Sequence, residues 1–226
     1  MAMRGTAALA MWWAMAAPMR REFEHWHSHE HFPERLRIAG FLRASRWLDV
    51  DGGDGVFVLY ELASHDVLSS PAYLARLNAP TPWSTALMPH HRGMVRAQCH
   101  IDASFGGVIA RHAMTLRFTL DADRAEALTR SLMPRLAHAS TEAGLSGAHL
   151  MRHDAPAIAQ TTEQAIRGGA DRPADRVLLV CGYALDALRD VARVLASAAE
   201  PGGACARDGD WQAFTLSASV IGDDVT

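Results

Sequence analysis

Four of the chain's twelve histidines fall within seven positions of the segment EHWHSHEHFPER, residues 24–35. An imidazole titrates near neutral pH, so it can transfer a proton, ligate a metal ion or simply hydrogen-bond at a protein surface. The segment therefore predicts a metal site, an acid–base site or a polar helix end, and its spacing has to decide among them.

Helical spacing divides the four histidines into two groups. At about 100° per residue, His27, Glu30 and His31 share one face of a helix. His25 and His29 point elsewhere and are expected at the surface. We therefore predict His31, His27 and Glu30 as the catalytic group, at the inner edge of the helix.

A metal site is the weaker interpretation. In the zinc-protease pattern a second histidine follows the first by four positions, and from His29 that position is Pro33. Imidazoles at i and i+4, here His27 and His31, could still hold one ion with a carboxylate from elsewhere. We expect no bound metal, with this alternative left open.

Acid–base chemistry fits His31 better. Pro33 is expected to end the helix, which would place His31 in the last turn, where free carbonyl groups and Glu30 favour the charged imidazole. Burial against Trp26 would oppose both effects, and opposed effects can hold an imidazole near neutrality. The alternative is that His31 only hydrogen-bonds the carbonyls at a polar helix end.

Aromatic and histidine side chains elsewhere are candidates for the walls of a pocket. One of Tyr60 and Glu61 must face inward because strand residues alternate. Core packing is the alternative for the tryptophans, and a hydrogen-bonded core histidine for His149. The segment TTEQAIRG, 161–168, is typical of a solvated helix. The predicted substrate-binding residues are Tyr60, Trp13, Trp26, Trp83, His91 and His149.

The elements that must position these residues follow a repeated order. The apolar run 7–16 predicts a buried strand, the stretch 19–32 a helix, and the DGGD turn a hairpin. The predicted strands are 7–16, 41–50, 56–62, 94–104, 110–120, 145–154, 176–183 and 211–221. Predicted helices include two after 62, the first capped by Ser64 and the second by Thr81, one capped by Asp121 and closed by Gly144, and 184–200.

This order is β-α-β-β-α-β, written twice. It predicts an α+β fold of tandem ferredoxin-like repeats, residues 1–106 and 107–226. Each four-stranded antiparallel sheet has helices on one face and needs cover on the other. Packing the two sheets face to face, as an α+β barrel within one chain, supplies that cover.

Bulk properties narrow the function. The hydrophobic fraction is 49% and the net charge is −3, which gives no electrostatic case for nucleic acid or an anionic membrane surface. Cys99, Cys181 and Cys205 are too few and too widely spaced for a disulfide framework. The apolar N-terminus imitates a signal peptide, but the strand interpretation is favoured, so we expect a cytoplasmic protein.

The run EFEHWHSHEHFPERLRIAGFLRASRW, followed by FVLYEL and SPAYLARLNAPTPW, resembles the dimeric α+β-barrel superfamily, its EthD-like branch in particular. The motifs cover 12–96; beyond that the likeness is one of topology. It implies a site in the helix–sheet cleft with His31 first, then His27 and Glu30, and Tyr60 from the facing sheet. Because this chain carries two units, the dimerisation that is usual in the superfamily is in doubt. A homodimer remains an open alternative.

The superfamily includes cofactor-free oxygenases, isomerases, haem-degrading enzymes and members without known activity, so the resemblance leaves the reaction open. The leading hypothesis is an enzyme that applies metal-free acid–base chemistry to a small apolar or aromatic compound, without a cofactor. A non-catalytic small-molecule-binding or accessory protein on the same fold, and a haem-binding or haem-degrading monooxygenase, are the alternatives.

Overall fold

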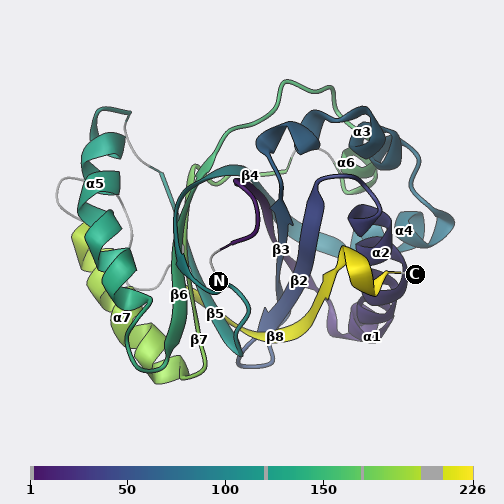
Figure 1. Cartoon of the computed structure of the whole chain (residues 1–226). Coiled ribbons are helices and arrows are strands. Elements are labelled where there is room, and N and C mark those ends of the chain that lie inside the picture. The colour runs from purple at the N-terminus through teal and green to yellow at the C-terminus, as the bar shows by residue number, and fades with distance from the viewer. Residues whose placement is uncertain (1–2, 120–121, 169–170, 200–210, 226) are drawn as a thin grey trace.

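The computed structural model describes residues 3–119, 122–168, 171–199 and 211–225. Eight antiparallel strands close into a barrel in the order β1-β3-β2-β8-β5-β7-β6-β4 (Figure 1). The strands are β1 (Ala7–Met15), β2 (Phe41–Asp49), β3 (Gly55–Leu62), β4 (His91–Gly106), β5 (His112–Phe118), β6 (Leu145–His153), β7 (Arg176–Gly182) and β8 (Gln212–Ile221).

The barrel consists of two four-stranded groups with one order. The first group reads β4-β1-β3-β2 and the second β8-β5-β7-β6, and the groups meet where β2 pairs with β8 and β4 with β6. The predicted tandem ferredoxin-like arrangement, closed within one chain, is confirmed. The division of the chain into repeats at 1–106 and 107–226 stays a prediction.

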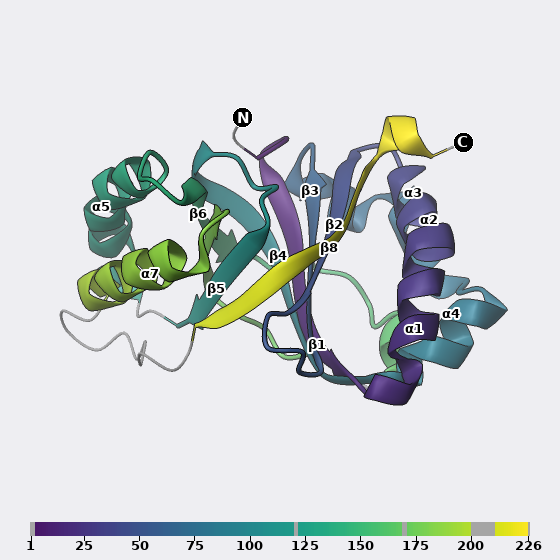
Figure 2. The ribbon, with the colours of Figure 1, turned by 90° about the horizontal axis from the view of Figure 1, so that it is seen from below.

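Helices pack on the outside at two opposite ends (Figures 1 and 2). One end carries α5 (Ala122–Ala139) and α7 (Leu185–Ala199). The other end carries α1 (Ala17–Trp26), η1 (His27–His31), α2 (Phe32–Leu36), η2 (His65–Ser69), α3 (Pro71–Asn78), α4 (Pro82–Leu87), η3 (Met88–His90) and α6 (Thr162–Ile166). The short η4 (Gly222–Asp224) follows β8. No described helix is long and apolar enough to cross a membrane.

Aromatic side chains pack the interior of the barrel. Trp12, Trp47, Phe57 and Phe214 are all buried there, and Phe57 stacks on Trp12 with 5.1 Å between ring centroids. The Trp12 indole donates a 3.0 Å hydrogen bond to Thr115 Oγ1 on the far group of strands. The barrel is therefore a core that joins the two groups.

The apolar N-terminal run is β1, as predicted, and it pairs with β3 on one side and β4 on the other. Both faces are covered, which is why the run is continuously apolar. Because strand residues alternate, Trp12 points into the barrel and Trp13 points toward the helices. The ring centroids of Trp13 and Phe23 are 5.7 Å apart. Tyr60 and Glu61 also point to opposite faces of their strand. Tyr60 packs on the helix side, and Glu61 Oε1 lies 2.6 Å from Arg43 Nε.

The expectation that Pro33 ends the first helix is wrong. The chain stays helical from α1 through the π-helical turn η1 into α2, and the Phe32 amide donates to the His27 carbonyl, five residues back. Pro33 stands in the first turn of α2, where its missing N–H costs least. The wider π turn separates the two α-helical segments and accommodates the proline ring.

Other differences concern helix ends. Ser64 precedes a 3₁₀ turn without capping it, whereas Ser70 caps α3 by accepting from the Tyr73 amide. Thr81 caps α4 as predicted, accepting from the Ser84 amide. Asp121, the predicted cap of α5, lies outside the described residues. Positive φ of +96° at Gly144, in the turn after α5, agrees with a glycine stop.

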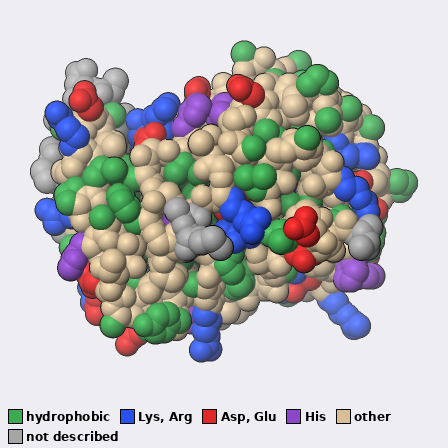
Figure 3. Space-filling model, viewed as in Figure 1, with side chains coloured by type: hydrophobic (Ala, Val, Ile, Leu, Met, Phe, Trp, Pro, Cys, Tyr) green, Lys and Arg blue, Asp and Glu red, His purple; other side chains and the backbone are tan. Residues whose placement is uncertain are grey.

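Charged side chains are mixed on the surface. Basic and acidic side chains are interspersed on the face seen in Figure 3. This agrees with the small net charge of −3, which gave no case for nucleic acid as a partner.

Thr115→Val should lower the free energy of unfolding by about 1–3 kcal/mol, because the Trp12 indole N–H would stay buried without its acceptor. Urea denaturation followed by circular dichroism measures this change. Thr85→Val, on an exposed helix face, is the matched control and should change stability by less than about 0.5 kcal/mol. Equal effects of both substitutions would contradict a structural role for the Trp12–Thr115 bond.

Candidate active site

We call the end that carries α1 to α4 and α6 the first helical end, and the end that carries α5 and α7 the second helical end. A small cavity lies between the first helical end and the strands that it covers. Its volume is about 30 Å³, room for one or two water molecules. The lining residues are Leu9, Met11, Trp13, Trp26, His27, His31, Arg35, Tyr60, Tyr73, Leu77, Met88, His91, Met94, Arg96, Thr161, Glu163 and Arg167. Polar and aromatic groups from β1, β3, β4, η1, α2 and α6 thus converge on one point.

Six of the nine predicted site residues line this cavity. They are His31, His27, Tyr60, Trp13, Trp26 and His91. The rings of His27 and His31 stack on each other, the His91 ring stacks on Trp13, and the His31 ring is tilted against Trp26. Ring centroids are 5.2 Å apart between His27 and His31, 4.5 Å between Trp26 and His31, and 4.8 Å between Trp13 and His91.

Glu30 does not line the cavity, contrary to expectation. Its carboxylate accepts hydrogen bonds from the Trp26 indole at 3.0 Å and from the Thr81 hydroxyl at 2.5 Å. The expected common face assumed α-helical spacing, but residues 27–31 form a π turn, which changes the angle between successive side chains. Glu30 therefore holds the Trp26 indole by a hydrogen bond and links η1 to the start of α4.

Trp83 and His149 also lie away from the cavity. The Trp83 indole donates to Glu22 at 2.8 Å on the partly exposed outer side of α4. His149 is fully buried on β6, where its Nδ1 lies 2.9 Å from Ser104 Oγ. The core-histidine alternative therefore describes His149.

A buried ion pair crosses the cavity wall, and the sequence did not reveal it. Arg35 Nη2 lies 2.5 Å from Glu163 Oε1, and both side chains are at most 5% exposed. Glu163 belongs to α6, at the end of a segment that leaves β6 and runs over to the first helical end (Figure 1). We call residues 154–168 the arm. The prediction of a solvated helix at 161–168 is wrong, because Thr161 and Glu163 are buried.

The cavity wall carries excess positive charge. Arg35, Arg96 and Arg167 line it, against the single carboxylate Glu163. Arg167 also pairs with Asp171 at 2.9 Å, so three guanidinium groups face two carboxylates. Arg96 donates to Tyr73 Oη at 2.9 Å, and no described carboxylate lies within ion-pair distance of it. Such a wall favours an anion in the cavity.

The three cavity histidines are neutral at physiological pH. Burial lowers the pKa of His31 and of His27 well below the ordinary value, and nearby positive charge, from Arg35 for His31 and from Arg46 for His27, lowers each further. Burial, with Arg167, lowers the pKa of His91 to about 3. The opposed effects expected at a helix end are absent for His31, because the helix continues beyond it. Burial raises the pKa of Tyr60, so its phenol stays protonated.

Unpaired polar atoms concentrate around the cavity. Thirteen buried side-chain nitrogen and oxygen atoms of the described residues have no hydrogen-bond partner, and seven of them belong to residues that line the cavity. The seven are Trp13 Nε1, His27 Nδ1, His31 Nδ1, Arg35 Nη1, Tyr60 Oη, His91 Nδ1 and His91 Nε2. Buried polar groups without partners are costly, so this cluster points to a polar ligand.

Among the described residues, the second helical end shows no comparable cluster of unpaired buried polar atoms. The buried side chains between α5, α7 and their strands are all apolar, from Leu116 and Leu132 to Leu188 and Leu195. Aliphatic side chains fill the space between these helices and their strands. One of the two repeats thus serves as structure, and the other carries the candidate site.

Haem does not fit the cavity in its closed form. A cavity of about 30 Å³ is far below the roughly 300–1,000 Å³ of sites for larger ligands. At the second helical end, the space between helices and sheet is filled by aliphatic side chains. The unpaired imidazole nitrogens of His27 and His31 are possible iron ligands, and Trp13 and Trp26 line the same small cavity. The expectation of no bound cofactor stays a prediction.

Removing one member of the buried ion pair should destabilise the protein. Glu163→Leu leaves the Arg35 charge buried without a counterion, and the free energy of unfolding should fall by about 3–5 kcal/mol. The double variant Arg35→Met, Glu163→Leu should recover much of that loss, because no charge remains uncompensated. Chemical denaturation of the four proteins in this cycle measures both effects. A single variant as stable as the wild type would contradict the pair's role.

Stability should fall on acidification. The unfolded chain binds protons at histidine below about pH 6.5, whereas the native cavity histidines do not. Unfolding therefore becomes easier as pH falls from 6.5, by up to about 1.4 kcal/mol per pH unit for each histidine.

In His91→Phe the slope of the unfolding free energy against pH should decrease by the contribution of one histidine, because burial holds the pKa of His91 at about 3 in the wild type. Urea midpoints at several pH values between 7.5 and 5 give the slope. The exposed His29→Gln variant is the control and should keep the wild-type slope. An unchanged slope in His91→Phe would contradict a neutral, buried imidazole.

Comparisons with known proteins identify the fold. No family model matches the sequence, and no curated protein matches it. Among solved structures, an anthrone oxidase-like protein has a TM-score of 0.63 at 8% identity, covering 96% of this chain and 93% of its own. A candidate monooxygenase of Lactobacillus acidophilus NCFM has a TM-score of 0.62 at 8% identity, with 97% of both chains covered.

Chlorite dismutase from Candidatus Nitrospira defluvii matches with a TM-score of 0.55 at 12% identity, over 98% of this chain and 94% of that one. Identities this low show the fold alone. The chain therefore shares the ferredoxin-like α+β-barrel fold of monooxygenase-like proteins. The finer resemblance to the EthD-like branch stays a prediction.

Proposed function

We propose that the chain is an enzyme that removes a proton from a small, mostly aromatic compound, with His31 as the base. The observation that carries this proposal is the cluster of seven unpaired polar atoms at one buried cavity, where neutral imidazoles lie beside an arginine. A neutral imidazole accepts a proton, and a guanidinium stabilises the anion that is left. The site thus combines the two functions that proton abstraction needs.

His31 is the best placed of the three histidines. Arg35 follows it by four residues on the same helical run, and it is the charge that lowers the pKa of His31 most. For His27 the largest charge effect comes from Arg46, which hydrogen-bonds Ser28 and Ser217 outside the cavity. Proton transfer to His31 would therefore create negative charge on the substrate near Arg35.

The Arg35 Nη1 and Tyr60 Oη atoms have no partners. Each is a donor that could hydrogen-bond an oxyanion, since burial keeps the Tyr60 phenol protonated. Glu163 holds the other Arg35 nitrogen, which orients the guanidinium. An enolate or phenolate is therefore the anion that the site favours.

The remaining walls suit an apolar ring. Trp13 and Trp26 offer flat faces, and Met11, Met88 and Met94 offer flexible side chains. A cavity of about 30 Å³ is too small for an aromatic substrate in this closed form, so binding requires these methionines to repack. A planar molecule could then lie between the tryptophans with its acidic proton toward His31.

Oxidation is the reaction that the fold neighbours suggest. An anthrone-type substrate has an acidic CH₂ group beside its rings; removing one proton gives an anion that reduces dioxygen. The CH₂ group becomes a carbonyl whose oxygen comes from O₂, and the second oxygen atom leaves as water. Four electrons pass from carbon to dioxygen in total, so no further reductant is needed. The anthrone oxidase-like neighbour supports the choice of this substrate class.

An oxygen-electrode assay with anthrone, with the quinone followed by its absorbance, tests the proposal. The wild type should consume one O₂ per quinone. His31→Ala should lower kcat by about 10²–10⁴-fold, the usual contribution of a positioned base. The kcat/KM of the wild type should stay level through pH 6.5, because burial holds the pKa of His31 well below that value.

Controls separate catalysis from binding and from folding. His29→Ala alters an exposed histidine two positions away and should keep wild-type activity. His31→Gln keeps a polar side chain of similar size and should still bind the substrate, as seen by quenching of tryptophan fluorescence. Full activity in both His31 variants would show that His31 is not the base. Binding without turnover in the wild type would favour the non-catalytic alternative.

A further inference from the structure

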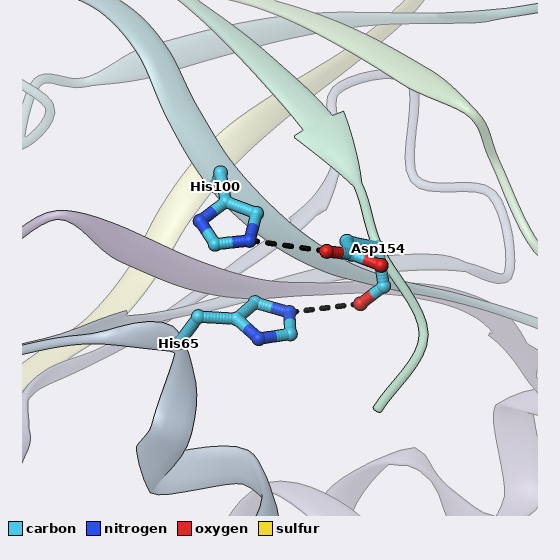
Figure 4. A group of neighbouring side chains, drawn as sticks. All are labelled: His65, His100 and Asp154. Carbon is cyan, nitrogen blue, oxygen red and sulfur yellow. Dashed lines mark hydrogen bonds and ion pairs between the residues drawn. The ribbon is translucent and has the colours of Figure 1, made fainter. Parts of the chain in front are cut away.

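Outside the cavity, a second group of potential ligands lies where the arm begins. His65, His100 and Asp154 each offer one ligand atom, and the three atoms lie within 4.8 Å of one another. Figure 4 shows both imidazoles directed at Asp154 from the same side. We propose that these residues form a binding site for one divalent transition-metal ion, with Zn²⁺ as the reference ion.

The distances suit a metal ion. The Nε2 atom of His100 lies 3.2 Å from Asp154 Oδ2. Two ligands at about 2.0–2.2 Å from a tetrahedral zinc ion are separated by about 3.3 Å, so this nitrogen and oxygen need little movement. The His65 and His100 rings are nearly parallel, with 16° between planes and 4.3 Å between centroids. Rotation of the His65 ring out of its contact with the Asp154 carbonyl would bring its nitrogen to the same ion.

The backbone holds the three residues in place before any ion binds. His100 lies within β4, opposite Ala7 of β1 and Arg152 of β6. The Asp154 amide donates to the Gln98 carbonyl at 2.8 Å, and the Asp154 carbonyl lies 2.8 Å from His65 Nε2. Only side-chain rotations are therefore needed, which keeps the entropic cost of binding low.

Two imidazoles and one carboxylate prefer a borderline ion such as Zn²⁺, Ni²⁺ or Co²⁺ over Mg²⁺ or Ca²⁺, which take oxygen ligands. The His100 side chain is 38% exposed and that of Asp154 is 56% exposed. Solvent can therefore supply the fourth ligand, as in zinc sites with three protein ligands and a water.

The position of the site gives the ion a structural consequence. His65 and His100 belong to the first half of the chain, and Asp154 is the first residue of the arm that brings Glu163 to Arg35. An ion at this place would tie the start of the arm to β4 and to η2. It would act on the arm without touching the cavity itself.

Isothermal titration of the untagged, chelator-treated full chain with ZnCl₂ tests the site. One equivalent of Zn²⁺ should bind, and His65→Ala, His100→Ala and Asp154→Asn should each weaken binding at least tenfold. The double variant His25→Ala, His29→Ala removes the exposed histidine pair on the first helix, whose rings are 4.7 Å apart, and should bind like the wild type. Titration with CoCl₂ should give visible absorption bands that His100→Ala lacks.

Thermal unfolding provides a second measurement. Stoichiometric Zn²⁺ should raise the Tm of the wild type and leave that of Asp154→Asn unchanged, because an ion that binds only the native state stabilises it. The metal-free Tm of each variant shows that it folds. No binding up to 100-fold excess Zn²⁺, binding that persists in His100→Ala, or binding lost only in the His25, His29 variant would overturn the proposal. Each of these results is independent of turnover at His31.

Discussion

The Arg35–Glu163 ion pair is the contact on which the candidate site depends. It joins residues 128 positions apart, one on the helix behind the cavity and one on the arm. With both charges almost fully buried, neither partner tolerates the loss of the other, since a lone buried charge is far more costly than a paired one. The pair therefore fixes the position of α6 against α2. Burial lowers the pKa of His31, and the positive charge of Arg35 lowers it further.

The π turn at His27–His31 determines which side chains reach the cavity. In a regular α-helix Glu30 would have shared a face with His27 and His31. In the wider turn its carboxylate instead holds Trp26 and the cap of α4. His27 and His31 therefore lie among aromatic rings and guanidinium groups, while the Glu30 carboxylate is bound elsewhere. π turns are rare and often occur at functional sites. Here the turn separates His31 from the Glu30 carboxylate, which would have favoured the charged imidazole.

The two repeats of the barrel have diverged in chemistry while keeping one topology. Both four-stranded groups have the same order, and both carry helices on their outer faces. Between α5, α7 and the sheet the chain places leucine, valine and alanine, which pack densely and stabilise the fold. At the other end it places histidine, arginine and tryptophan around a small cavity. Of the described residues of the second repeat, those that line the cavity belong to the arm.

Much of the fold could be predicted from the sequence by itself. Apolar runs, the DGGD turn and the doubled β-α-β-β-α-β order determined the strands and the barrel, because each of these signals is local. The pattern around His27 and His31 also indicated residues that line the cavity. Alternation required that one of Tyr60 and Glu61 face the helices, and only the structure shows that it is Tyr60. Only the tertiary structure decided the rest. Arg35 and Glu163 have the composition of a solvated surface, and they are buried because the arm brings Glu163 against Arg35. The π turn was equally hidden, since Pro33 in the sequence indicates a helix end, and packing around the cavity carries the helix through it.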